Sequence, residues 1–197
     1  MHPSTTSLAL MLVLTMACIP TSKTDTGTTC DFITNGDAEQ GDLTGWTSST
    51  ETAVAAVESQ DQSDGTVTPY GGDWFFSFAL DKTATAEMTH SCSPAPDAAT
   101  CTLSGVVQTE GMGEPPDHGI ATLRFVDSGG TTLAEQSTDP LSTESLAWQP
   151  FEVQLDVPED ALKLQIILAG TLAYGDYVNV FWDDLELSCE DGVSSAS

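Results

Sequence analysis

The chain has 197 residues, of which 40% are hydrophobic, and this is enough for one domain with a packed core. It contains 30 acidic residues against 4 basic ones, so the formal net charge is −26. Nucleic acids and anionic membrane surfaces would repel such a chain, which excludes both as partners. The acidity fits bound cations, a salty medium or a solvated surface that keeps the protein soluble.

Residues 1–17 are predicted to be a secretory signal peptide. Their apolar run, SLALMLVLTMA (7–17), is too short to span a bilayer and ends in small residues just before Cys18. The ending TMAC resembles a bacterial lipobox, which implies lipidation of Cys18 and a lipoprotein anchored at the outer membrane or cell surface. An ordinary signal peptidase would cut at the same bond and would leave a periplasmic or secreted protein.

Two further stretches are predicted to lack regular structure. Residues 18–29 include the small and polar run PTSKTDTGTT, which is typical of a flexible tether between an anchor and a domain. Residues 191–197, with the sequence DGVSSAS, are predicted to be a disordered tail. The folded domain is therefore expected over residues 30–190.

The dominant pattern within the domain is an alternation of apolar and polar residues with a period of two. It is clearest in the segments ATLRFVD (121–127), FEVQLDVP (151–158) and LKLQIIL (162–168). Such alternation is typical of strands with one buried face, and the turn signals YGGD, DSGG and VPED fall between the strands. No segment shows a convincing helical period. The pattern predicts an all-β fold, either a two-sheet sandwich or a barrel.

The spacing of the cysteines favours two disulfides. Lipidation of Cys18 would leave four of the five cysteines, and an exported protein resides in an oxidising compartment. Cys92 and Cys101 flank a proline-containing loop and could staple a hairpin, while Cys30 and Cys189 bracket the domain. Metal ligation by these cysteines is the less favoured alternative, because the sequence has no C-x-x-C pair.

An ordered set of motifs resembles the galactose-binding-like jelly rolls, the fold shared by many carbohydrate-binding modules. The segments that carry the resemblance are NGDAEQGDLTGW (35–46), PYGGDWFFSFAL (69–80), AWQPFEVQLDVPEDALKLQIIL (147–168) and FWDDLEL (181–187). The resemblance covers residues 30–189 and implies a two-sheet antiparallel jelly roll. It also implies that the first and last strands lie close together, so that Cys30 would pair with Cys189.

The same resemblance implies a structural calcium ion held by Glu39 and Asp183. Calcium needs six to eight oxygen ligands. Asp183 shares strand parity with Leu185 and Leu187, so its carboxylate would point inward, where an unpartnered charge is costly and a cation would help. The alternative is that both carboxylates cap turns through backbone N–H groups.

A sugar site is predicted from aromatic residues that fall out of phase with the expected core. Trp182 lies opposite in parity to Phe181, and Phe75 is similarly out of phase with its neighbours. Loop tyrosines and two polar side chains could complete a cleft: Tyr70, Tyr174, Tyr177, Arg124 and Gln154. The alternative is that these rings pack beneath loops. Trp46 and Trp148 are expected to be core anchors.

Catalysis has little support, because the sequence contains no nucleophile elbow, HExxH or P-loop pattern. The sequence therefore predicts a non-catalytic binding module at the cell surface, with carbohydrate as the favoured ligand and calcium as a structural ion. The alternative is a structural or protein-adhesion lipoprotein that retains the fold without a sugar ligand.

Overall fold

The computed structural model describes residues 30, 32–49, 52–63, 65–79, 84–109, 116–143, 146–173 and 175–191. The predicted signal peptide, Cys18 and the tether lie outside these residues, as does the chain beyond Asp191. The described residues form twelve strands: β1 (Trp46–Ser48), β2 (Ala55–Val57), β3 (Gln60–Gln62), β4 (Gly65–Val67), β5 (Phe75–Ser77), β6 (Thr85–Cys92), β7 (Ala98–Thr109), β8 (His118–Val126), β9 (Thr132–Ser137), β10 (Gln149–Asp156), β11 (Lys163–Thr171) and β12 (Val180–Asp191). Strand β12 includes Asp191, the first residue of the predicted tail.

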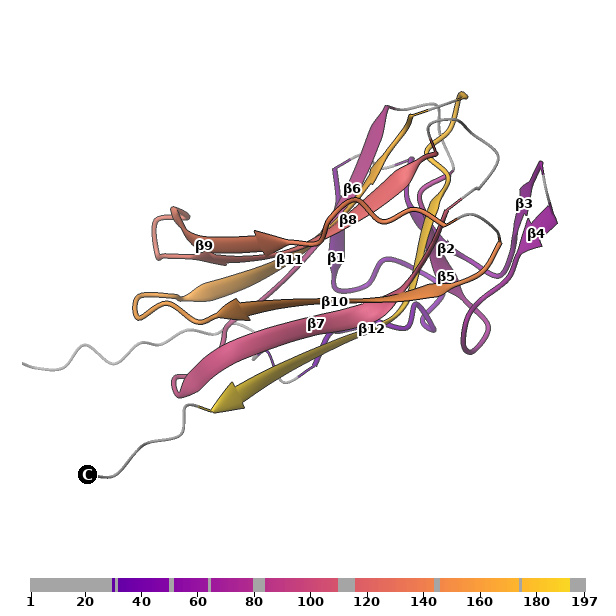
Figure 1. Cartoon of the computed structure of the whole chain (residues 1–197). Helices are drawn as coiled ribbons and strands as arrows, with labels where there is room; N and C mark the ends of the chain where they lie inside the picture. The colour runs from indigo at the N-terminus through magenta and orange to yellow at the C-terminus, as the bar shows by residue number, and fades with distance from the viewer. Residues whose placement is uncertain are drawn as a thin grey trace, which may run out of the picture.

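The strands form two antiparallel sheets that face each other as the layers of a sandwich (Figure 1). The first sheet has the order β1-β6-β11-β8-β9, and the second sheet has the order β10-β7-β12-β5-β2. Strands β3 and β4 pair separately as a short hairpin that stands away from the sandwich (Figure 1). The predicted all-β, two-sheet antiparallel sandwich is confirmed. Within the described part of the chain, no helix is long and apolar enough to cross a membrane.

The main core lies between the sheets and is built by the predicted alternation. In β11, Leu164, Ile166 and Leu168 are fully buried, while Lys163, the first residue of the strand, is exposed. From the second sheet, Leu103 and Trp182 pack into the same core cluster. Burying each such side chain stabilises the fold by about 1.5–3 kcal/mol.

A second, smaller cluster covers part of the outer face of the second sheet. Its buried members are Val67, Phe75, Ala79 and Phe181, and Val57, Leu146 and Trp148 pack against them. As a result, all three residues of β5 are buried. Both faces of this part of the second sheet are therefore apolar, and strand parity does not separate inside from outside there.

A β-bulge divides β12 into two parts. The register of β12 against β7 shifts between Asp183 and Glu186, and Asp184 has a positive φ of 51°. Because a bulge changes which side successive residues face, Trp182 and Leu185 both belong to the main core although they differ in parity. The N–H of Leu185 donates to the carbonyl of Gly36 at 3.1 Å, which attaches the N-terminal loop to the bulge.

The four domain cysteines form two disulfides, but the predicted pairing is wrong. Cys30 bonds to Cys92, and Cys101 bonds to Cys189. Cys92 ends β6 in the first sheet while Cys101 lies in β7 of the second, so the connection between them crosses the sandwich instead of forming a hairpin. Cys101 and Cys189 are direct partners in the β7–β12 register, with their Cα atoms 4.1 Å apart. The N–H of Cys30 also donates to the carbonyl of Ser93 at 2.9 Å, so a hydrogen bond joins the same two segments beside the Cys30–Cys92 disulfide.

Candidate functional site

Glu39 and Asp183, the predicted calcium ligands, both hold the loop that precedes β5. The Oε1 atom of Glu39 accepts the N–H groups of Asp73 and Trp74, each at 2.9 Å, and Oε2 accepts the Asp73 N–H at 3.1 Å. Gly72 lies directly over this carboxylate, and a Cβ atom there would stand 2.2 Å from Oε1. The loop therefore closes tightly on Glu39.

Asp183 holds the same loop from the other side. Its Oδ2 accepts the N–H groups of Tyr70 at 2.9 Å and Gly71 at 3.3 Å, and its Oδ1 accepts the N–H of Asp184 at 2.8 Å. Burial raises the pKa of the Asp183 carboxyl from 3.8 to about 6, although these three N–H groups favour the ionised form. We call the two carboxylates and residues 70–74 the loop clasp.

The loop clasp matches the turn-capping alternative considered from the sequence. Each carboxylate accepts three N–H bonds, which leaves about one lone pair on each for a cation. Among the described residues, no group of three or more His, Cys, Asp or Glu side chains could hold a metal ion. A calcium ion here would need main-chain oxygens and water for most of its ligands, and calcium binding stays a prediction.

A groove lies beside the loop clasp on the outer face of the second sheet. Its volume is about 480 Å³, and its walls come from β7, β10, β12 and the loop before β5: Tyr70, Ser104, Gly105, Val106, Pro150, Phe151, Glu152, Asp184 and Glu186. In the strand register, Ser104 pairs with Glu152 on one side and Glu186 on the other. One row across three strands therefore carries a hydroxyl between two carboxylates.

Tyr70 is the exposed aromatic residue of this groove, with 56% of its surface accessible. Its ring stands edge-on to Trp148 with centroids 6.5 Å apart, and Trp148 in turn packs edge-on against Phe75 at 5.8 Å. The indole N–H of Trp148 donates to the carbonyl of Thr68 at 3.0 Å. The outer cluster and the Asp183 carboxylate thus fix the position of Tyr70 while its ring remains accessible.

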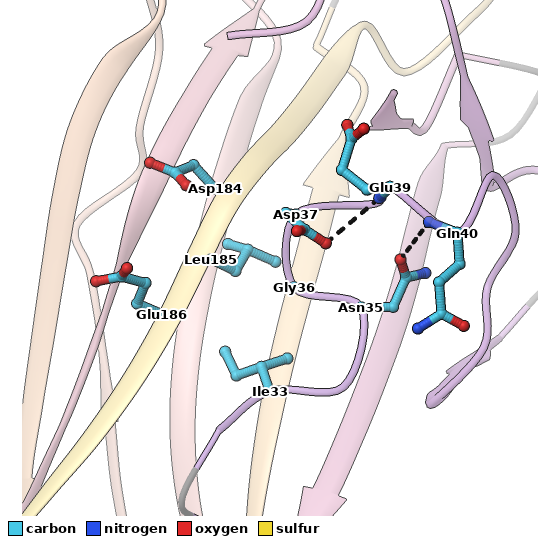
Figure 2. Close-up of a pocket in the computed structure, with 9 residues that line it drawn as sticks. All are labelled: Ile33, Asn35, Gly36, Asp37, Glu39, Gln40, Asp184, Leu185 and Glu186. Atoms are coloured by element: carbon cyan, nitrogen blue, oxygen red, sulfur yellow. Dashed lines mark hydrogen bonds between the residues drawn. The ribbon is translucent and has the colours of Figure 1, made fainter. Parts of the chain in front are cut away.

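A second hollow of about 460 Å³ lies on the other side of the β12 bulge (Figure 2). It is lined by the N-terminal loop and the bulge: Ile33, Asn35, Gly36, Asp37, Glu39, Gln40, Asp184, Leu185 and Glu186. The side-chain oxygen of Asn35 accepts the N–H of Gln40 at 3.0 Å, which closes this loop (Figure 2). Asp184 and Glu186 line both hollows, so these two carboxylates form a ridge between them.

Trp182 and Phe75 do not form a sugar site, and this prediction is wrong. Trp182 is fully buried in the main core, where it packs edge-on against Phe151 at 5.3 Å. Phe75 is fully buried in the outer cluster. The bulge accounts for the first error because it reverses the expected parity, and the apolar outer face accounts for the second.

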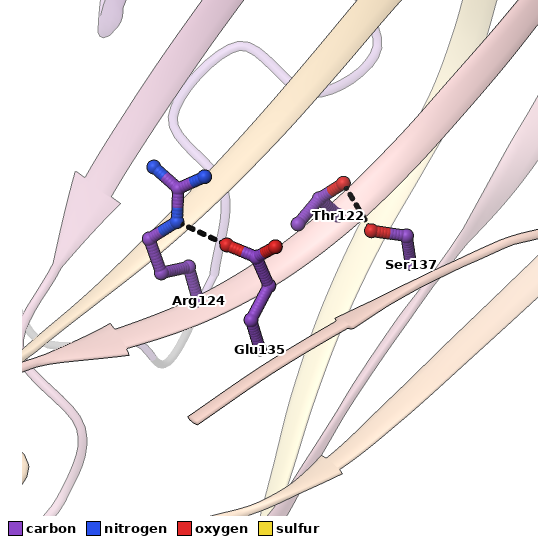
Figure 3. A network of polar contacts seen from close by, with 4 residues as sticks. All are labelled: Thr122, Arg124, Glu135 and Ser137. Carbon is purple, nitrogen blue, oxygen red and sulfur yellow. Dashed lines mark hydrogen bonds and ion pairs between the residues drawn. The ribbon is translucent and has the colours of Figure 1, made fainter. Parts of the chain in front are cut away.

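The other predicted ligand residues that the structure describes do not line the groove. Arg124 lies on β8 in the first sheet, where its Nε donates to the Glu135 carboxylate on β9 (Figure 3). Tyr177 is 40% exposed in the connection before β12, and Tyr174 lies outside the described residues. Of the two loop tyrosines that the structure describes, Tyr70 lines this groove and Tyr177 does not.

Sequence reasoning missed the polar residues of the groove floor. Glu152, Ser104 and Glu186 are outward-facing members of alternating strands, a pattern that normally indicates a solvated face. Their grouping depends on the order and register of β10, β7 and β12, which the pattern of a single strand does not contain.

Comparison with solved structures finds the same β-sandwich fold in several carbohydrate-binding modules. The module TmCBM61, solved in complex with β-1,4-galactotriose, has 19% identity and a TM-score of 0.56 over 81% of this chain and 99% of its own. The CBM22-1 xylan-binding domain of Paenibacillus barcinonensis Xyn10C has 16% identity and a TM-score of 0.55 over 84% of this chain and 98% of its own. The resemblance in fold inferred from the sequence motifs is confirmed.

An enzyme also shares the fold. The enzymatically active domain of tailspike protein 4 from bacteriophage CBA120 has 13% identity and a TM-score of 0.61 over 82% of this chain, which spans only 22% of the tailspike chain. No protein-family model and no curated protein matches the sequence. At these identities the likeness establishes the fold, and the ligand has to be argued from the groove.

Proposed function

We propose that the protein is a non-catalytic carbohydrate-binding module whose ligand lies in the groove over β10, β7 and β12. The observation that carries the proposal is the exposed ring of Tyr70, held in place at the edge of a groove with a polar floor. A sugar presents an apolar ring face and a rim of hydroxyl groups. An aromatic ring beside hydroxyl and carboxylate acceptors offers contacts to both.

The neighbours in fold support this reading. One is solved with a galactotriose, and another is named as a xylan-binding domain. Each of these two modules is matched over nearly its full length. The enzymes among the neighbours are matched over small parts of their chains, 22% of the tailspike protein and 29% of an α-L-arabinofuranosidase. The groove of the present chain is therefore proposed to bind a saccharide without cleaving it.

A glycan array followed by calorimetry tests the proposal. Tyr70→Ala is expected to weaken binding by about tenfold, which is about 1.4 kcal/mol, because the stacking surface is lost. Tyr177→Ala is the matched control, since this tyrosine is exposed but does not line the groove. Absence of binding to every glycan, or equal affinities for wild type and Tyr70→Ala, would favour the structural or adhesion alternative. Release of shortened saccharides would contradict the non-catalytic assignment.

Two further parts of the proposal concern the setting of the module. We propose that Glu39 and Asp183 contribute to a calcium site and that the chain is exported and anchored through Cys18. Chelation should lower the melting temperature if calcium binds the folded protein, and an unchanged melting temperature would argue against the ion. Metabolic labelling with a fatty acid, compared between wild type and Cys18→Ser, tests the anchor.

A further inference from the structure

The charged side chains that line the groove all have the same sign. Glu152, Asp184 and Glu186 are exposed there, and none of the three bonds to another described side chain. The second hollow continues the same charge with Asp37 and Glu39. A ligand in the groove therefore meets carboxylates from β10 on one side and from the ridge on β12 on the other.

The basic side chains of the described chain lie elsewhere. Arg124 is paired with Glu135 on the outer face of the first sheet (Figure 3). Lys163 is exposed on β11, also in the first sheet. Neither side chain lines the groove or the second hollow, so an anionic saccharide would find no compensating charge there.

The carboxylates are also spread out in a way that suits several separate positive charges. Glu152 and Glu186 flank Ser104 across three neighbouring strands, and strands lie about 4.8 Å apart, so the two positions are about 10 Å from each other. This spacing exceeds the reach of one small ion, in agreement with the finding that no three acidic side chains of the described residues could hold a metal. It also exceeds the width of one sugar ring, which favours a chain of sugars.

From this arrangement we infer that the groove binds an oligosaccharide bearing protonated amino groups, with Glu152 and Glu186 each facing an ammonium group and Tyr70 stacking on a ring. The inference rests on the proposed carbohydrate-binding function and specifies its ligand class. Ammonium groups donate charge-assisted hydrogen bonds to carboxylates, which are stronger than bonds between neutral groups. Long-range attraction to the acidic surface would also accelerate association at low salt.

A matched pair of ligands provides the test. Binding of a β-1,4-linked glucosamine hexasaccharide is compared by calorimetry with binding of its fully N-acetylated counterpart, at a pH where the amines are protonated. The amino form is expected to bind more tightly, and added salt should weaken its binding and leave that of the acetylated form nearly unchanged.

Variants of the groove then assign the preference to specific carboxylates. Glu152→Gln is expected to weaken binding of the amino form by up to about fivefold, the range of an exposed ion pair. Glu159→Gln is the control, because it removes the same charge from an exposed turn outside the groove. The combined variant Glu152→Gln, Asp184→Asn and Glu186→Gln should bind both oligosaccharides equally. Asn tolerates the positive φ at position 184, so this variant keeps the bulge.

Several results would overturn the inference. Equal affinity of the wild type for both oligosaccharides would leave carbohydrate binding intact and remove the amino preference. An oligolysine of equal charge that binds as tightly, or a Glu159→Gln effect as large as that of Glu152→Gln, would mean general attraction to an acidic protein. Failure to bind these and every neutral glycan would refute the proposed function itself.

Discussion

The outer faces of the two sheets are built from similar alternating strands, yet they differ in what covers them. On the first sheet, Thr122 and Arg124 of β8 bond to Ser137 and Glu135 of the neighbouring strand β9, so polar groups are paired within the sheet (Figure 3). On the second sheet, loops add an aromatic cluster over one part and leave unpaired carboxylates beside it. The groove therefore depends on the loops before β5 and β10, because both sheets have the same kind of strand.

The largest effect is expected from a variant that removes an aromatic ring from the cluster on the outer face of the second sheet. Phe75→Ala is expected to lower the free energy of unfolding by about 3–5 kcal/mol, because the ring is fully buried on the outer face. Urea denaturation measures the change. Leu133→Ala is the control, since Leu133 is an exposed apolar residue on β9 of the first sheet and should cost less than about 0.5 kcal/mol. Similar costs for the two variants would mean that the two outer faces are equally exposed.

The next effect concerns the packing of Trp182 against the first sheet. A Cβ atom added to Gly119 of β8 would stand 2.6 Å from the Trp182 ring, so Gly119→Ala should destabilise the protein by about 1–3 kcal/mol. Gly71→Ala provides the comparison, because no atom lies within 4 Å of the corresponding position. A stability unchanged by Gly119→Ala would show that Trp182 can leave the core, as the sequence pattern suggested.

The Asp183 carboxyl of the loop clasp should make the free energy of unfolding depend on pH. Burial raises the pKa of Asp183 from 3.8 to about 6, so the folded state binds a proton that the unfolded state has released between these values. This contribution to stability is present below about pH 4 and is lost as the pH rises through about 6. Denaturation in the presence of chelator should show less of this loss in Asp183→Asn than in wild type, even if the variant is less stable throughout.

His90 in the first sheet acts in the opposite direction and must be accounted for in that experiment. Burial lowers the pKa of this histidine from 6.5, although its bond to the Gly45 carbonyl opposes the shift. Its contribution is therefore lost as the pH falls below about 6.5. Because His90 is present in both proteins, its effect cancels in the difference between wild type and Asp183→Asn. Parallel pH profiles of the two would contradict the assignment to Asp183.

The smallest effect is expected on the outer face of the first sheet. Arg124→Ala should change the free energy of unfolding by less than about 1 kcal/mol, because the pair with Glu135 is partly exposed. It should leave glycan affinity unchanged, since Arg124 does not line the groove. Calorimetry on the same glycan used for Tyr70→Ala checks this, and a matching loss of affinity would place the ligand on the first sheet.

The strands and the sandwich could be predicted from the sequence because the alternation of apolar and polar residues lies within each strand. The alternation in FEVQLDVP and LKLQIIL corresponds to β10 and β11, with Phe151 and Val153 buried as expected. Local turn chemistry also fitted, since Asp127 of the DSGG segment accepts N–H groups from Gly129 and Thr131. These features depend on neighbours in the chain, which the sequence displays directly.

The site was harder to predict because it depends on contacts between distant segments. The prediction that Trp182 faces outward was wrong because the bulge at Asp183–Glu186 is not visible in an alternating pattern. The predicted disulfide pairing was wrong because the pairing depends on which strands become neighbours. Cys101 faces Cys189 only once β7 lies beside β12. Tyr70 could be named as a loop aromatic from the sequence, but its place beside Glu152 and Glu186 follows from the fold.

If the chain is anchored through Cys18 as proposed, the disulfide between Cys30 and Cys92 has a mechanical consequence. Tension along a tether attached at Cys18 would enter the domain at Cys30 and pass through the covalent bond into the end of β6. The N-terminal loop, which continues from Cys30 toward β1, would share this tension in parallel with the bond. The disulfide would thus pass part of any pull on the anchor straight into the first sheet and limit how far the N-terminal loop is stretched.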